Sequence, residues 1–132
     1  MTKWCGRLPI RRPRAWYAGL RLVRLDASTL DGADAVVNEA AFGRPGASRG
    51  NSADPQLRLV SLGENGTHVL FGSQLAPSEV GEVTLAQSVL ARLPQGMLGL
   101  ADRRFFGFAL GTAARASGAD LLWRIKKNMR LA

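Results

Sequence analysis

The chain has 132 residues and a formal net charge of +8, and hydrophobic residues make up 46% of it. That length fits one small domain, and the hydrophobic fraction is sufficient for a core. Cys5 and His68 are the single cysteine and the single histidine, which excludes an internal disulfide and a zinc site built from several of these residues. No apolar run approaches the roughly 20 residues needed to span a bilayer, so we expect an intracellular protein with no membrane partner.

The positive charge is concentrated at both ends of the chain. Residues 1–25 contain seven Lys or Arg and no acid, and residues 103–132 contain seven bases and one acid. The stretch between them, residues 26–102, contains nine acids and four bases. Basic flanks around an acidic middle fit a metal site surrounded by side chains that bind phosphate. The alternative is that the arginines reflect a GC-rich coding sequence and are simply solvated.

The first half of the chain reads as three strands after a basic N-terminal segment, residues 1–18, whose prolines argue against a long helix. A short helix at 33–41, with Asp34 as its N-cap, is expected in the polar stretch that follows the first strand. The last two strands are joined by an Asn-Gly turn, which favours a hairpin. Alternation of apolar residues places the three strands at 19–30, 56–63 and 68–75.

The second half of the chain alternates helices and strands. Ser78 is the expected N-cap of a helix with Glu79 and Glu82 in its first turn. Gly118 is the expected end of a second helix that begins at residue 105 or 106. Strands are predicted at 97–101 and 120–125, each directly after a helix. The first of these helices carries an apolar stripe formed by Leu85, Ala86, Val89, Leu90 and Leu93.

The resulting order, β-β-β-α-β-α-β, predicts an α/β fold with a mixed sheet and helices packed on it. Asp26 follows the apolar run 19–25, and Asp102 follows the apolar run 96–101. Carboxylates at the ends of neighbouring buried strands are rigidly held and can share a divalent cation. The alternatives are that Asp26 forms a turn and that Asp102 caps the helix after it.

Three separated sequence motifs and one later segment carry a resemblance to a known family. Together with the element order, they resemble the ribonuclease H-like catalytic core of bacterial insertion-sequence transposases of the DDE type, over about residues 19–132. The motifs are Leu25-Asp-Ala-Ser-Thr-Leu-Asp31, Ala41-Phe-Gly-Arg-Pro-Gly-Ala-Ser-Arg-Gly50 and Leu100-Ala-Asp-Arg-Arg-Phe-Phe-Gly-Phe108, and the segment is Leu122-Trp-Arg-Ile-Lys126.

The resemblance implies phosphoryl transfer on DNA by three carboxylates that bind Mg²⁺ or Mn²⁺. Asp26 then matches the first metal ligand and Asp102 the second. The implied partners are the terminal repeats of an element, the target DNA and, in a full-length enzyme, a second protomer. The implied location is the cytoplasm, on the nucleoid. The implied nucleic-acid contacts are Arg103, Lys126, Arg44 and Arg49.

The third carboxylate of the family has no counterpart before Ala132, because Asp120 is the one acid after Asp102 and stands at a strand start. The expectation is therefore a partial catalytic domain, incomplete at its C-terminus and inactive alone. Ala27 and Arg104 also depart from the family, which prefers Gly after the first Asp and a small residue two after the second.

Two further functions remain open from the sequence. A basic remnant could bind DNA without catalysis, or pair with a full-length copy and inhibit it. A ribonuclease H-like nuclease could use Glu82 as the third ligand beside Asp26 and Asp102, although a glutamate in a first helical turn more often serves the helix dipole.

Overall fold

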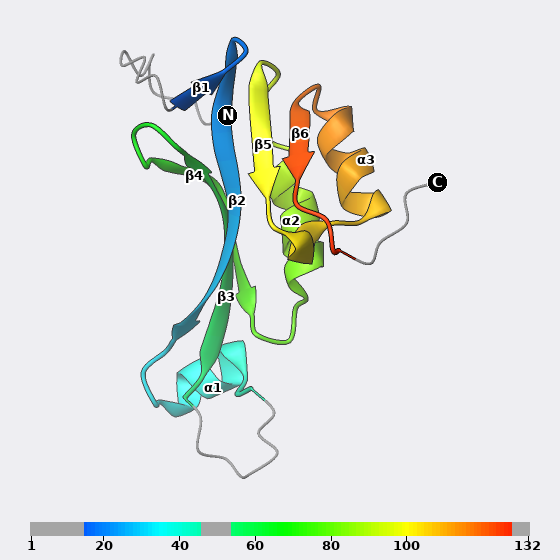
Figure 1. The fold of residues 1–132 in the computed structure, drawn as a ribbon. Helices are drawn as coiled ribbons and strands as arrows, with labels where there is room; N and C mark the ends of the chain where they lie inside the picture. Colours follow the sequence, from blue (N-terminus) through cyan, green and yellow to red (C-terminus); the bar gives the residue numbers. More distant parts are fainter. Residues whose placement is uncertain (1–14, 46–53, 128–132) are drawn as a thin grey trace.

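The computed structural model describes residues 15–45 and 54–127. Within these ranges the chain forms a mixed sheet with helices α2 and α3 packed against it (Figure 1). In chain order the elements are β1 (Trp16–Tyr17), β2 (Leu20–Asp31), α1 (Val36–Phe42), β3 (Gln56–Glu64), β4 (Leu70–Pro77), α2 (Glu82–Leu90), β5 (Met97–Ala101), a 3₁₀ turn (Arg103–Phe105), α3 (Phe108–Ala116) and β6 (Asp120–Trp123).

The strand order in the sheet is β4-β3-β2-β5-β6, with β1 also paired to β2. β2, β3 and β4 are antiparallel neighbours, whereas β5 runs parallel to β2 and β6 parallel to β5. The parallel connections need crossovers, and α2 and α3 supply them. The predicted ribonuclease H-like mixed sheet is confirmed. β2 lies at its centre, between β3 and β5.

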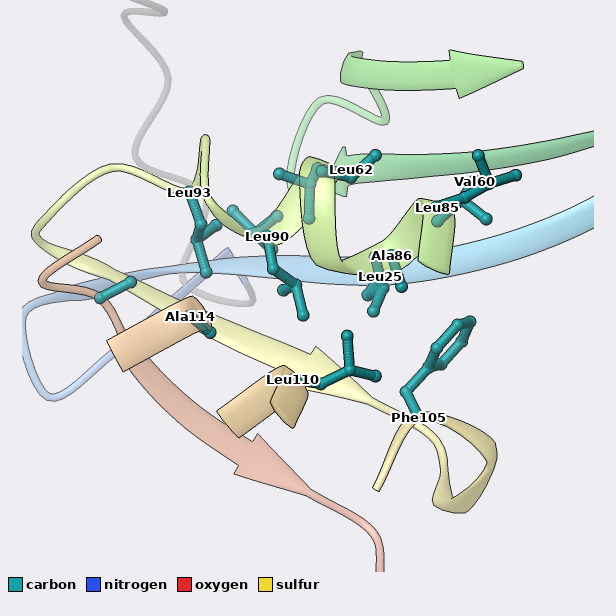
Figure 2. Close-up of a cluster of buried hydrophobic side chains, with 13 residues drawn as sticks. Leu25, Val60, Leu62, Leu85, Ala86, Leu90, Leu93, Phe105, Leu110 and Ala114 are labelled. Carbon is teal, nitrogen blue, oxygen red and sulfur yellow. The ribbon is translucent and has the colours of Figure 1, made fainter. Parts of the chain in front are cut away.

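One face of the sheet packs on the helices through alternate residues of the strands. Val23 and Leu25 of β2 and Val60 and Leu62 of β3 point to this face and are buried. Four residues of the expected stripe lie on α2 and are buried in the same cluster, namely Leu85, Ala86, Val89 and Leu90. Leu93 joins this cluster from the segment just after the helix. Figure 2 shows these side chains meeting residues of α3. The further members of the cluster are Phe105, Leu110, Ala114 and Ala119.

The helix boundaries differ from the prediction at three starts. α3 begins at Phe108, after a separate 3₁₀ turn at Arg103–Phe105, and not at residue 105 or 106. α2 begins at Glu82 with Gly81 as N-cap, not at Ser78. The Ser78 N–H instead donates to the Gln56 carbonyl at 3.1 Å, which continues the β4–β3 pairing. Arg58 from β3 donates to the carbonyl of Val80 at 2.6 Å and holds the intervening turn. These contacts come from a strand more than 20 residues away, so local propensity could not predict them.

The third start is that of α1, which has Ala35 as N-cap and no side-chain cap. Asp34, the predicted cap, instead forms an ion pair with Arg44. In the second half of the chain, β5 occupies the predicted range. Gly118 follows α3 with φ +80°, a conformation that favours glycine, as expected.

A buried carboxylate joins the hairpin turn to the first strands. Glu64 is 1% exposed and accepts hydrogen bonds from the backbone and hydroxyl of Thr67 and from Arg21 Nε at 3.3 Å. The Arg21 guanidinium also lies over the ring of Trp16, 5.9 Å from its centroid. Burial raises the pKa of Glu64, but hydrogen bonds from Thr67, the Gly66 N–H and Arg21 outweigh it and lower the pKa to about 2.

The depressed pKa of Glu64 predicts loss of stability in acid. The unfolded chain binds a proton near the ordinary pKa of 4.5, whereas the folded chain does so near 2. Stability from this group is therefore complete above about pH 5 and is lost as the pH falls toward 2, by about 3 kcal/mol in total. Urea unfolding of the native chain and of Glu64→Gln between pH 7 and pH 3 checks this. The native chain should show the steeper fall, and equal slopes would contradict the assignment.

Candidate active site

Asp26 and Asp102 lie at the ends of neighbouring parallel strands. The β2–β5 register pairs Val23 with Gly99 and Arg24 with Leu100. Extending that register by two residues places Asp26 opposite Asp102, just where β5 ends. β2 continues to Asp31, so the segment of β2 that begins at Asp26 has no β5 neighbour.

Both carboxylates line one cavity of about 180 Å³. Asp26 is exposed within the strand, which rules out the alternative that it forms a turn. Its Oδ1 accepts the Ala27 N–H at 2.9 Å. Leu25 and Ala27 form part of the cavity wall, together with Phe105 and Arg104. The two acids predicted from the sequence are thus brought together, although they are far apart in the chain.

Asp102 has two structural contacts beside its place in the cavity. Its Oδ1 accepts the Arg103 N–H at 2.7 Å and caps the 3₁₀ turn. Arg124 Nη1 lies 3.9 Å from the same oxygen. The capping alternative is therefore correct, but it leaves Oδ2 available. Among the described residues, no hydrogen bond engages Oδ2 of either aspartate.

The predicted DNA contacts Arg103 and Lys126 lie next to the acidic pair. They line a second cavity of about 360 Å³ together with Asp102, Arg104 and Phe106. Asp102 and Arg104 line both cavities, so the basic and acidic parts of the site adjoin. Lys126, which the family resemblance implies as a DNA contact, follows β6, the parallel neighbour of β5.

Arg44 and Arg49 are not brought to this site by the described structure. Arg44 follows α1 and forms ion pairs with Asp34 and Glu39. Those hydrogen bonds raise the pKa of the Arg44 guanidinium. Arg44 lines neither of the two cavities. Arg49 lies outside the described residues, so both DNA contacts stay predictions.

Glu82, the alternative third ligand, is paired with an arginine in the described structure. Within residues 15–45 and 54–127, no group of three or more Asp, Glu, His or Cys residues could hold a metal ion. Glu82 binds Arg104 instead, with Nη1 at 3.2 Å from both carboxylate oxygens. The sequence did not predict this pair, because its members belong to different elements and stand 22 residues apart.

The aromatic residues after Asp102 have three different environments. Phe105 is 4% exposed and belongs to the core. Phe106 packs edge-on against Trp123, with ring centroids 6.2 Å apart. Phe108 is 92% exposed and does not join the core. It stands at the start of α3, where its side chain borders a largely apolar hollow of about 810 Å³.

The described helices include none that is long and apolar enough to cross a membrane. No protein-family model matches the chain. Over 109 residues the chain is 29% identical to a protein of Escherichia coli (strain K12) named "Putative transposase InsZ". That alignment covers 82% of this chain and 36% of the relative, so the chain spans about a third of the relative's length.

The fold is similar to that of a piggyBac transposase solved by cryo-electron microscopy in a synaptic complex with hairpin DNA. The TM-score is 0.50 at 11% sequence identity, over 83% of this chain and 24% of that one. This likeness concerns the fold, while the likeness to the bacterial protein concerns the sequence. The two comparisons agree: the chain is similar in sequence to a bacterial protein named as a putative transposase, and its mixed α/β sheet is similar in fold to a transposase of known structure.

Proposed function

We propose that this chain is the catalytic-core region of a DNA transposase and that Asp26 and Asp102 hold Mg²⁺ or Mn²⁺ against a DNA phosphodiester. The observation that carries this proposal is the shared cavity, which brings together two carboxylates from different strands. The relationship to a bacterial transposase names the reaction class. The net charge of +8 favours a polyanionic substrate.

The donor set fits a hard divalent cation. Mg²⁺ is commonly held by one or two carboxylates, with water and substrate phosphate as its other ligands. Asp26 and Asp102 supply that number, each with one oxygen already fixed by a backbone N–H. When bound, the cation would stabilise negative charge on the transferring phosphoryl group and favour formation of the attacking oxyanion.

The other residues of the site bind and orient the substrate in this proposal. Arg103 and Lys126 line the adjoining cavity and would bind backbone phosphates on one side of the acidic pair. Phe105 anchors the 3₁₀ turn in the core and so fixes the backbone that carries Asp102. Element ends, target DNA and a second protomer are the partners that the proposal implies for the whole enzyme.

Mn²⁺ binding to the full 132-residue chain, followed by electron paramagnetic resonance, tests the shared site. Asp26→Asn and Asp102→Asn are each expected to weaken Mn²⁺ binding by about tenfold or more, since each removes a direct ligand. Asp120→Asn is the matched control. It removes the same charge from an exposed residue paired with Leu98, at the opposite end of β5 from Asp102.

Equal Mn²⁺ affinity in all four proteins would contradict the shared site. A second function that the charge distribution supports is that of a non-catalytic DNA-binding protein. In that case DNA binding would be steeply dependent on salt and unchanged in Asp102→Asn, without measurable Mn²⁺ binding at the pair.

A further inference from the structure

Arg104 occupies the boundary between the acidic and the basic part of the candidate site. Its side chain lines the cavity of Asp26 and Asp102 and also the cavity of Arg103 and Lys126. It is 67% exposed, so a ligand entering either cavity from solvent can reach it. The backbone beneath it is held firmly, because the next residue, Phe105, is buried in the core.

Glu82 fixes the direction of the Arg104 guanidinium. Both oxygens of Glu82 accept from Nη1 at 3.2 Å, and the Glu82 side chain is 21% exposed. Glu82 stands in the first turn of α2, whose N-cap provides no side-chain hydrogen bond. The free N–H groups there favour a carboxylate and so stabilise Glu82 independently of the arginine.

This pairing leaves most of the guanidinium available to a ligand. Arginine carries five N–H donors in a planar fork that matches phosphate. In the described part of the chain, Nε and Nη2 of Arg104 donate to no protein acceptor. The carboxylates of Asp26 and Asp102 are the competing partners in the same cavity, and a guanidinium bound to them would compete with a divalent cation.

We propose that Arg104 binds a backbone phosphate of the DNA substrate and that Glu82 is a positioning residue that holds Arg104 for this contact. The inference rests on the proposed function for the identity of the substrate. It assigns to the Glu82–Arg104 pair the role of keeping the guanidinium off the metal-binding carboxylates. Arg104 thereby extends the basic lining of Arg103 and Lys126 up to the acidic pair.

The proposal and simple electrostatics predict opposite effects of Glu82→Gln on the affinity for DNA. Removing the negative charge of Glu82 should strengthen binding to DNA if that charge only repels phosphate. If Glu82 positions Arg104, Glu82→Gln should instead weaken binding. We expect both Glu82→Gln and Arg104→Ala to weaken it by about five- to tenfold, and the double variant by no more than Arg104→Ala.

The measurement is fluorescence anisotropy of a labelled DNA duplex titrated with the full chain in Mg²⁺ at several salt concentrations. Arg104→Ala should also reduce the slope of log affinity against log salt by about 0.9, the loss of one phosphate contact. Arg92→Ala and Glu79→Gln are the matched controls. They change the same charges at exposed residues that line neither cavity.

The outcomes separate this inference from the proposed function. Stronger DNA binding by Glu82→Gln, or equal losses in Arg104→Ala and Arg92→Ala, would overturn the positioning role. Mn²⁺ binding is the independent readout, and it should be retained in Arg104→Ala and weakened by about tenfold or more in Asp26→Asn. Retained Mn²⁺ binding with unchanged DNA binding would overturn the inference and leave the metal site standing. Weaker DNA binding without Mn²⁺ binding at the pair would support the phosphate contact and count against the metal site.

Discussion

Replacing Phe105 with alanine is expected to lower the free energy of unfolding by about 3–5 kcal/mol, because it removes a buried ring and leaves a cavity. Phe105 is 4% exposed, and it packs with side chains of the sheet, α2 and α3 (Figure 2). It also lines the cavity of Asp26 and Asp102. Urea denaturation followed by circular dichroism measures the change.

Phe108→Ala is the matched control for that experiment. The two phenylalanines are three residues apart, but Phe108 is 92% exposed and its removal opens no cavity in the core. We expect a change within about 0.5 kcal/mol. A loss for Phe105→Ala as small as that for Phe108→Ala would show that the core does not include the 3₁₀ turn. The inference that Phe105 fixes the backbone carrying Asp102 would then be wrong as well.

Replacing Glu64 with alanine is expected to cost about 3 kcal/mol of stability at pH 7, since it leaves several part-buried donors without their acceptor. The Thr67 N–H and hydroxyl both lose their partner, and Arg21 loses its counter-charge. Arg21 is 14% exposed at its side chain, which limits how far it can be rehydrated in place. Thermal and urea unfolding at pH 7 measure the loss.

Two comparisons make the Glu64 result specific. Glu79→Ala removes the same charge from an exposed residue and should change stability by less than about 0.5 kcal/mol. The variant Arg21→Ala should destabilise less than Glu64→Ala, because Glu64 keeps its hydrogen bonds from Thr67. If Arg21→Ala destabilises the protein more than Glu64→Ala does, the ion pair and not the hydrogen bonds of the turn supplies most of the stability that Glu64 contributes.

The central prediction about the site came from strand ends alone. A carboxylate directly after each of two apolar runs is a local feature, and parallel neighbours bring such ends to the same edge of a sheet. That reasoning singled out Asp26 and Asp102, which line one cavity in the structure, and their role as metal ligands stays a prediction. It could not assign Glu82, because its partner Arg104 lies on a separate element and their contact depends on how α2 packs.

Periodicity and turn residues in the sequence determined the strands, the apolar stripe of α2, the Asn-Gly hairpin and the glycine after α3, because these depend on contacts within a few residues. The tertiary structure decided where α2 starts, which phenylalanine is buried and why Glu64 is charged in the interior. For the first two, the deciding partners lie on other elements: Gln56 and Arg58 for the turn before α2, and the packed sheet and helices for Phe105. Glu64 is held charged mainly by Thr67 and Gly66 of its own turn, with Arg21 added from β2. Contacts between elements depend on distances that a single sequence does not encode locally.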